Sequence, residues 1–358
     1  MAIYAIAYSG PGFTGKVKTL SIADDGTLSA VIHTGTFDSG DGVYSILAPK
    51  IVHIFGDVYA IFYAGQGNDG WLKTITIDAD GIIGAVINSW EWNSTYGVAA
   101  SPLLLSGNVW AFAHTADSIN GPGRITTVNI ADDGTIGAAI NSGDYEAVSQ
   151  TSAPVLFRIS GTVYGIAYGG PNNDGFLKTI TIADNGTVGA VINTLEFDTD
   201  DCDNPSVVSL GSNVWGIAYG GPDGDGWLRT ITIQDNGTIT GEATNFEFDA
   251  VQGRYPDIAS VSGSVYAIAY YGPGNDCWLK TLLVESEINS LNIDAFGGIV
   301  PKLLHITGNI WAITYQGFGN DGWTRTVSIA DDGTIGSIIR SLEWDTVFGK
   351  EPSIIALA

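Results

Sequence analysis

The chain contains few cysteines and few basic residues, and each shortage excludes a class of protein. Only two of its 358 residues are cysteine, and Cys202 and Cys277 have neither the number nor the spacing of a disulfide framework or a metal site. Lysine and arginine total 14 against 38 aspartates and glutamates, which gives a net charge of −24. Such a charge argues against nucleic acid or an anionic membrane as a partner.

Long apolar runs and helical periodicity are also missing. No apolar stretch approaches the length of a membrane-spanning helix, so no membrane insertion is expected. The first apolar run, residues 3–8, is too short for a signal peptide, and none is predicted. Apolar residues follow no helical period, and 48 glycines are too many for long helices. The sequence does not fix the compartment, and we favour an extracellular or cell-surface location.

What the chain does contain is a short β-branched and aromatic phrase that recurs seven times. Its copies begin at Ile3, Val58, Val109, Val163, Val214, Val265 and Ile310. Their aromatic residues are 45 to 55 residues apart, and another 51 residues lead from Trp311 through the C-terminus back to Tyr4. The chain therefore divides into seven similar units, which is typical of stacked supersecondary repeats.

Each unit reads as four strands. In residues 205–249, four runs rich in β-branched and aromatic residues are separated by turns. Between the third and fourth runs stands Asn236-Gly237, a pair that favours a tight hairpin. The sequence thus predicts an all-β fold, a seven-bladed β-propeller of four-stranded antiparallel blades. We expect a single domain over residues 1–358, and a monomer.

The two ends of the chain complement each other. The chain starts in the second run of a unit and finishes with residues 352–357, which match a first run. We therefore predict that residues 352–358 complete the first blade, with strand 352–357 paired to the N-terminal strand. This resembles the "velcro" closure common among propeller families.

The loop between the second and third runs repeats an acidic residue and an aromatic residue, as in Asn68-Asp69-Gly70-Trp71. An aromatic face can stack on a sugar while carboxylates and amides bind its hydroxyls. The candidate ligand-binding residues are Asp69, Trp71, Asp174, Phe176, Asp225, Trp227, Asp276, Trp278, Asp321 and Trp323. The alternative is architectural: the aromatic residue wedges between blades, the aspartate caps its turn, and the basic residue two positions later pairs with a glutamate.

Carboxylates also begin the loop that leads from each unit to the next. They are Asp38, Asp198, Asp249, Asp294 and Asp345, with Asn93 and Glu146 in the other two units. A ring of these groups near the channel mouth could bind Ca²⁺ or provide a glycosidase acid/base pair. No catalytic residue is singled out, because each carboxylate resembles its copies. Apart from Ca²⁺ no cofactor is expected, and no metal ligands are assigned.

The first run of each unit is expected to line the central tunnel. Its fourth residue after proline varies most and reads His53, Ser106, Arg158, Ser209, Ser260, His305 and Ala356. We predict His53, Arg158 and His305 as tunnel-lining residues that could give a ligand site its specificity. The alternative is that these residues face a water-filled tunnel without a ligand.

The whole chain resembles a seven-bladed β-propeller, without the Gly-His and Trp-Asp signature of WD40 repeats. Asp24-Asp25-Gly26-Thr27 and its copies resemble the Asp-box of sialidases, but the serine and aromatic spacing does not fit, so no sialidase residues are carried over. We predict a non-catalytic recognition domain that binds a glycan. The alternatives are a protein-interaction scaffold that binds a protein ligand, and a glycosidase or lyase with its site at the tunnel mouth.

Overall fold

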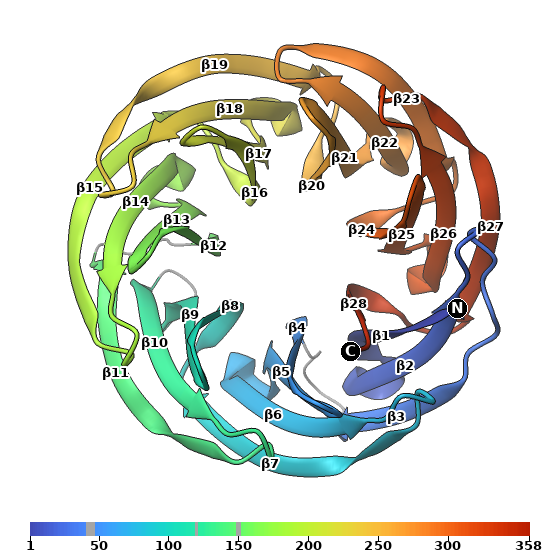
Figure 1. Cartoon of the computed structure of the whole chain (residues 1–358), viewed down its shortest axis with the longest axis horizontal. Helices are drawn as coiled ribbons and strands as arrows, with labels where there is room; N and C mark the ends of the chain where they lie inside the picture. The colour runs from blue at the N-terminus through green and yellow to red at the C-terminus, as the bar shows by residue number, and fades with distance from the viewer. Residues whose placement is uncertain (41–46, 119–120, 148–151) are drawn as a thin grey trace.

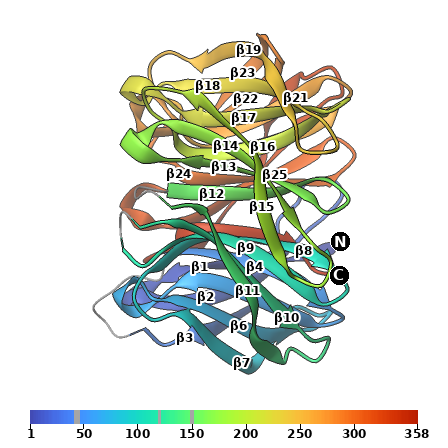
Figure 2. The ribbon, with the colours of Figure 1, turned by 90° about the vertical axis from the view of Figure 1, so that its left-hand side faces the viewer.

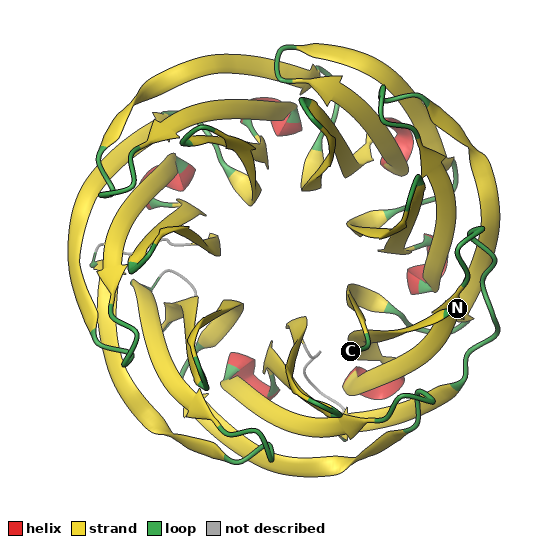
Figure 3. Ribbon diagram, viewed as in Figure 1, coloured by secondary structure: helices red, strands yellow, loops and turns green. Residues whose placement is uncertain are grey.

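The structure is a computed structural model that describes residues 1–40, 47–118, 121–147 and 152–358. These residues form seven four-stranded antiparallel sheets arranged as blades around an open centre (Figures 1 and 3). Seen from the side, the strands run between the two faces of a disc (Figure 2). The predicted seven-bladed β-propeller is confirmed. We number the blades 1 to 7 and call their strands A to D from the axis outward.

Strand A of each blade faces the axis, and strand B lies behind it. From blade 1 to blade 7, the A strands are β28 (Lys350–Ala356), β4 (Leu47–Phe55), β8 (Gly97–Ser106), β12 (Ser152–Ser160), β16 (Asp203–Gly211), β20 (Arg254–Ser262) and β24 (Ile299–Thr307). The B strands are β1 (Ala2–Gly10), β5 (Val58–Ala64), β9 (Val109–Ala116), β13 (Val163–Gly169), β17 (Val214–Gly220), β21 (Val265–Gly272) and β25 (Ile310–Gln316).

Strands C and D form the outer half of each blade. The C strands are β2 (Thr14–Ile22), β6 (Gly70–Ile77), β10 (Gly123–Ile130), β14 (Gly175–Ile182), β18 (Gly226–Ile233), β22 (Asp276–Leu283) and β26 (Gly322–Ile329). The D strands are β3 (His33–Asp38), β7 (Ile83–Asn93), β11 (Ile136–Glu146), β15 (Val188–Asp198), β19 (Ile239–Asp249), β23 (Ser286–Asp294) and β27 (Ile335–Asp345).

Short 3-10 turns follow strand B in six blades. They are η1 (Pro11–Phe13), η2 (Gln66–Asn68), η3 (Pro171–Asn173), η4 (Pro222–Gly224), η5 (Pro273–Asn275) and η6 (Phe318–Asn320). Within the described ranges, no helix has the length and apolar character needed to cross a membrane. Cys202 and Cys277 are both buried and free.

The ring closes as the sequence predicts. Strand β28 pairs antiparallel with β1, with Ile354 opposite Ile6 and Ala356 opposite Tyr4. The Leu357 amide donates a further hydrogen bond of 2.8 Å to the Ile3 carbonyl. The two termini accordingly lie beside each other (Figure 1). Blade 1 is therefore built from both ends of the chain.

The hydrophobic core lies between neighbouring blades. The cluster between blades 1 and 2, for example, contains Ala7 and Phe37 from one blade and Tyr59 and Ile75 from the other. All seven residues of β5 are buried. Because both faces of strand B are covered by adjacent blades, its sequence is continuously apolar and does not alternate.

A second set of contacts joins the blades at their C–D hairpins. In six blades, a buried threonine of strand C donates a hydrogen bond to the carbonyl of the hairpin glycine in the next blade. The pairs are Thr19 with Gly81, Thr74 with Gly134, Thr127 with Gly186, Thr179 with Gly237, Thr281 with Gly333, and Thr326 with Gly26. We call each pair a clasp. The hairpin glycines have φ between 81° and 88°, in the left-handed region, which explains why glycine recurs at this turn.

The junction between blades 5 and 6 has no such clasp among the described contacts. Strand β22 ends at Leu283 and β23 begins at Ser286, so blade 6 lacks the long hairpin of its neighbours. The Thr230 hydroxyl bonds instead to the Thr244 hydroxyl of its own blade at 2.8 Å. The shortened sixth repeat thus leaves one junction of the ring without this contact.

The clasp can be tested by removing one hydroxyl. The Thr326→Val variant should lower the free energy of unfolding by about 1–3 kcal/mol, because the Gly26 carbonyl loses a buried donor at 2.6 Å. The control is Thr230→Val, at the junction without a clasp, and it should cost less. Urea unfolding of both variants measures the difference. Equal losses would mean that the clasp adds nothing beyond an ordinary intrablade hydrogen bond.

Candidate functional site

The repeated Asn-Asp-Gly-aromatic loop is explained by turn geometry and packing. Asn68 occupies the left-handed region with φ 67°, which asparagine and glycine tolerate best. The following Asp69 amide donates to the Gln66 carbonyl at 3.1 Å. Gly70 has no room for a side chain, because a Cβ there would lie 2.4 Å from the Trp92 ring. Turn geometry and packing therefore account for the asparagine and the glycine of the phrase.

The candidate aromatic residues are partly buried against the clusters between blades. Trp71, Phe176, Trp227, Trp278 and Trp323 each pack on a different cluster. The candidate aspartates are partly buried at the B–C turns, and Asp174 is buried. The structure thus distributes these ten residues as one pair in each of five blades and does not bring the pairs together.

The carboxylates at the ends of the D strands are not a free ring. Asp345 accepts hydrogen bonds from the Tyr8 hydroxyl at 2.8 Å and from the Lys18 ammonium at 2.9 Å, both in the next blade. The same triad joins Asp38 with Tyr63 and Lys73, Glu146 with Tyr168 and Lys178, Asp198 with Tyr219 and Arg229, Asp249 with Tyr270 and Lys280, and Asp294 with Tyr315 and Arg325.

In the triads of Asp345 and Asp38 the donors lower the pKa of the carboxylate. Burial raises the pKa of Asp345, but donors from the Phe348 amide, Lys18 and Tyr8 outweigh it and leave the pKa below the usual value. Burial and the neighbouring carboxylate raise the pKa of the Tyr8 phenol, so the proton stays on the tyrosine. The basic residues of the repeat therefore pair with these carboxylates across the blade boundary.

The junction of blades 2 and 3 has a neutral arrangement in place of the triad. Asn93 stands at the carboxylate position, and His114 and Thr126 stand at the tyrosine and lysine positions. His114 bonds to the Thr126 hydroxyl at 3.0 Å and lies 4.5 Å from the Trp92 ring, centroid to centroid. Burial lowers the pKa of His114 to about 4, so the imidazole is neutral at pH 7. The divergence of the third repeat thus reflects a substituted packing contact.

The predicted tunnel residues lie at the A–B turns. The Nε2 atoms of His53 and His305 are 2.8 Å from the carbonyls of Gly56 and Gly308, and the Arg158 guanidinium donates to the Gly161 carbonyl. Register also corrects one position: Leu104, not Ser106, is the blade 3 residue equivalent to His53. The sequence alignment failed there because the proline of this strand, Pro102, stands two residues later than in the other blades.

A cavity lies on the axis at the other end of the A strands. It has a volume of about 680 Å³. Each A strand contributes a residue with φ between 40° and 55°, namely Ala48, Ala99, Ala153, Asn204, Tyr255, Val300 and Glu351. Such a φ is unfavourable for a β-branched residue such as Val300. A register shift at this point of each strand turns the chain toward the axis.

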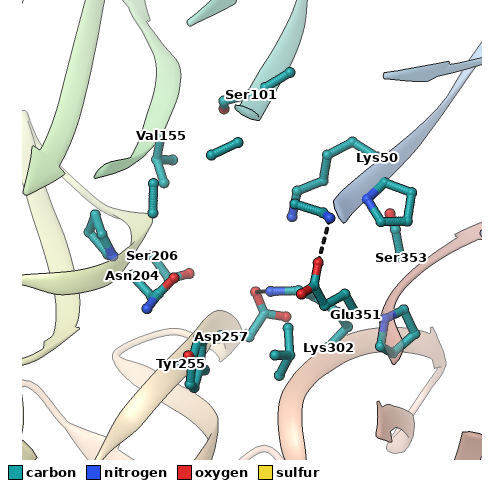
Figure 4. A pocket seen from close by; sticks show the side chains of 18 of the residues that line it. Lys50, Ser101, Val155, Asn204, Ser206, Tyr255, Asp257, Lys302, Glu351 and Ser353 are labelled. Carbon is teal, nitrogen blue, oxygen red and sulfur yellow. Dashed lines mark hydrogen bonds and ion pairs between the residues drawn. The ribbon is translucent and has the colours of Figure 1, made fainter. Parts of the chain in front are cut away.

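Two residues further along each strand, a second set of side chains lines the same cavity. These are Lys50, Ser101, Val155, Ser206, Asp257, Lys302 and Ser353. Figure 4 shows that the charged groups gather on one side of the open centre, while Ser101, Val155, Asn204 and Ser206 lie across from them. The charged side comes from blades 6, 7, 1 and 2. We call this cavity the axial pocket. Its charged residues are distributed unevenly around the axis, although the seven repeats are similar in sequence.

The two acids of the axial pocket have defined partners. Asp257 lies 3.6 Å from the Lys302 ammonium and accepts a hydrogen bond of 2.7 Å from the Leu303 amide. A Glu351 carboxylate oxygen accepts a hydrogen bond from the Ala48 amide. Asp257 is thus held by a cation, whereas Glu351 is held by a neutral donor.

Burial shifts the pKa values of Lys50 and Glu351 toward neutrality. Desolvation and the nearby Lys302 lower the pKa of Lys50 to about 8, against opposing effects of Asp257 and Glu351. Desolvation raises the pKa of Glu351, against the Ala48 amide, Lys50 and Lys350. A carboxylate with a raised pKa can act as a general base, and an ammonium beside it can stabilise an oxyanion.

Sequence reasoning missed the axial pocket because it looked at the wrong position of strand A. The residue directly after the proline carried the signal: Lys50, Asp257 and Lys302 are charged there, in a strand expected to be buried. The fourth position after the proline was chosen for its variability alone. Only the bulge at the start of each strand shows which of these residues face the cavity.

Metal binding is not supported by a cluster of ligands. In the part of the chain that the structure describes, no group of three or more His, Cys, Asp or Glu side chains is placed to hold an ion. The carboxylates considered for Ca²⁺ are those engaged in the triads. Binding of Ca²⁺ and the monomeric state both stay predictions.

Comparison with known proteins gives a fold and no family. No protein-family model and no curated protein matches the sequence. Among solved structures, the periplasmic gluconolactonase of Pseudomonas aeruginosa is similar, with 11% identity, a TM-score of 0.70, and 100% of this chain and 99% of that chain covered. A Bacteroides fragilis protein classed provisionally as a 6-phosphogluconolactonase has 12% identity and a TM-score of 0.71, with 100% and 98% covered. A similarly classed protein of Bacteroides uniformis has 11% identity and a TM-score of 0.68, with 99% of each chain covered.

These similarities correct the predicted function. The sequence predicted a non-catalytic recognition domain, with a scaffold or a glycosidase or lyase as alternatives, whereas the full-length matches named above are lactonases by description. The prediction rested on the aromatic and acidic residues of the repeated loops, and their role in binding a ligand stays a prediction. The charged axial pocket, which had no part in the prediction, is the site that the fold offers.

Proposed function

We propose that the protein is a hydrolase of cyclic esters, a lactonase, with its active site in the axial pocket. The observation that carries this proposal is that Lys50 and Glu351, both half-buried, line one cavity on the axis and act on each other electrostatically. Similarity over the whole chain to a gluconolactonase supports the reaction class. The volume of the cavity, about 680 Å³, is typical of a small-molecule site.

Ring opening needs a base and an oxyanion partner, and the pocket has a residue for each. Glu351 takes a proton from water as the water oxygen bonds to the carbonyl carbon of the lactone. The Lys50 ammonium stabilises the negative charge that develops on the carbonyl oxygen. The bond between that carbon and the ring oxygen then breaks, and protonated Glu351 returns its proton to the leaving alkoxide. The product is a hydroxy acid, and atoms and charge balance without a cofactor.

The Glu351→Gln variant tests the proposal. The amide oxygen of glutamine can still accept from the Ala48 amide, so the fold should be kept. The kcat for opening δ-gluconolactone, corrected for spontaneous hydrolysis, should fall about 10²- to 10⁴-fold. For the wild type, kcat should rise as Glu351 ionises, above the usual glutamate pKa of about 4.3. It should fall again as Lys50 loses its proton near its pKa of about 8.

The control is Glu343→Gln, which removes a carboxylate from β27 outside the pocket and should leave kcat unchanged. A wild-type protein that opens no lactone faster than buffer would refute the proposal. So would a Glu351→Gln variant with full activity.

We further propose that the protein acts outside the cytoplasm. The sequence favours an extracellular or cell-surface location, and the similar gluconolactonase of Pseudomonas aeruginosa is described as periplasmic. Fractionation of cells that express the full-length protein, with immunodetection in each fraction, tests this location.

A further inference from the structure

The D–A loops of the propeller share one geometry, so their tips can be compared between blades. In six blades the residue two positions after the strand-end Asp or Asn donates its amide to that side chain, at 2.8 to 3.0 Å. These tip residues are Gly40, Thr95, Asp200, Val251, Phe296 and Val347. The equivalent residue of blade 3 lies outside the described residues.

The tips are apolar in three consecutive blades. Val251, Phe296 and Val347 of blades 5, 6 and 7 are 69%, 81% and 63% exposed, whereas the tips of blades 1, 2 and 4 are glycine, threonine and aspartate. Phe318 adds a fourth group: it begins η6 in blade 7, where the other blades have proline or glutamine, and is 78% exposed. We call these four residues the apolar rim.

Two members of the rim, Phe296 and Phe318, lie on adjoining loops. Gly297, directly after Phe296, approaches the Phe318 backbone so closely that a Cβ on it would lie 2.9 Å from the Phe318 nitrogen. Loops of blades 6 and 7 therefore meet at the two phenylalanines. Exposed apolar groups that gather on one sector of a surface mark a binding region more often than scattered ones do.

The apolar rim lies on loops that lead to residues of the axial pocket. Val251, Phe296 and Val347 each precede a pocket residue of the same blade by four positions, namely Tyr255, Val300 and Glu351. Phe318 stands two residues after Gln316, another lining residue. A ligand that reaches out of the pocket over blades 5 to 7 would therefore meet apolar surface, whereas the described tips of blades 1, 2 and 4 offer none.

We propose that the ligand is amphipathic: a lactone with an alkyl or aryl substituent, whose ring lies at Lys50 and Glu351 and whose substituent lies on the apolar rim. This inference rests on the proposed lactonase activity and extends it to a substrate class. A polar sugar lactone would leave the four rim side chains without a ligand contact. An apolar substituent would remove them from water, which favours binding in proportion to the area covered.

The test is a series of δ-lactones with alkyl substituents of increasing length, assayed beside δ-gluconolactone. For the wild type, kcat/KM should rise about two- to fourfold for each methylene that reaches the rim. The double variant Phe296→Ser/Phe318→Ser should lose this dependence and keep its activity on δ-gluconolactone. The control is Phe55→Ser, at the A–B turn of blade 2, where the phenylalanine is 60% exposed and the dependence should persist.

The outcomes separate this inference from the proposed function. If the enzyme opens lactones without any dependence on chain length, or if the double variant keeps that dependence, the inference is wrong and the lactonase proposal stands. If no lactone is opened, calorimetry measures the binding of pentanoate, octanoate and decanoate. An affinity that rises with chain length in the wild type but not in the double variant supports an amphipathic ligand. An affinity that does not rise with chain length overturns the inference. Dimerisation in sedimentation that the double variant abolishes, with chain-length dependence unchanged, would assign the rim to a second copy of the chain and overturn the inference.

Discussion

A chain truncated after Glu351 should not fold to a trimmed native ring. The truncation removes most of β28, the innermost strand of blade 1, and leaves β1 as an unpaired edge inside the disc. The lost side chains include Ile354, Ile355 and Leu357, which pack on the clusters between blade 1 and its neighbours. Each contributes up to about 1.5–3 kcal/mol, and each lost ladder hydrogen bond about 0.5–1.5 kcal/mol.

The sum of these losses is comparable with the whole stability of an ordinary domain, about 5–15 kcal/mol. The exposed edge of β1 also favours aggregation. Size-exclusion chromatography and thermal melting of the 1–351 chain measure the outcome, with the 1–357 chain as a control that keeps all of β28. A synthetic peptide of residues 350–358, added in trans, should restore part of the native signal. A soluble, monomeric 1–351 chain with an unchanged Tm would show that β28 does not close the ring.

The Asp345→Ala variant should lose about 3–5 kcal/mol of unfolding free energy at pH 7. Asp345 is 7% exposed, and its removal leaves the Lys18 ammonium and the Tyr8 hydroxyl without their shared acceptor at the junction of blades 7 and 1. At this junction the last complete blade of the chain, blade 7, meets blade 1, which contains both ends of the chain. Chemical denaturation of the variant beside the wild type gives the difference.

The pH dependence of this loss has a definite sign. The folded pKa of Asp345 is lowered, so its contribution is fully present above the unfolded pKa of about 3.9 and disappears as pH falls through the lower folded value. The difference between wild type and Asp345→Ala should therefore be constant from pH 7 to about pH 5 and shrink at lower pH. A difference that persists at the lowest pH where the protein is folded would contradict the assignment.

The junction of blades 2 and 3 supplies a natural control for the triad. There, Asn93, His114 and Thr126 stand at the positions of Asp345, Tyr8 and Lys18, and no charge is left unpaired among these three. The triple variant Asp345→Asn/Tyr8→His/Lys18→Thr should therefore recover part of the stability that Asp345→Ala loses. Recovery would show that the cost comes from an unpaired buried charge. A triple variant that is less stable than Asp345→Ala would show that the cost comes instead from the packing of these side chains between the blades.

The sequence by itself determined the number of blades, the four strands of each, and the closure by residues 352–357. These features depend on local signals: β-branched runs repeated in seven units, Asp-Gly or Asn-Gly pairs in six of them, and a first run placed at the end of the chain. Each single copy is a weak signal for its local structure. Seven copies that end at the point of the repeat where the chain began together predict a closed ring of seven blades. The same repetition misled the functional prediction, because turn and packing residues recur as regularly as a multivalent site would.

Only the tertiary structure decided where the chemistry could lie. Whether Asp345 faces a tunnel or a lysine of the next blade depends on how blades pack, and no local pattern reports that contact. Likewise, Lys50, Asp257, Lys302 and Glu351 are spread over some 300 residues and belong to four blades, and they meet only because the ring brings the starts of the A strands to one axis. The shifted pKa values of Lys50 and Glu351 follow from that burial, which a sequence pattern does not contain.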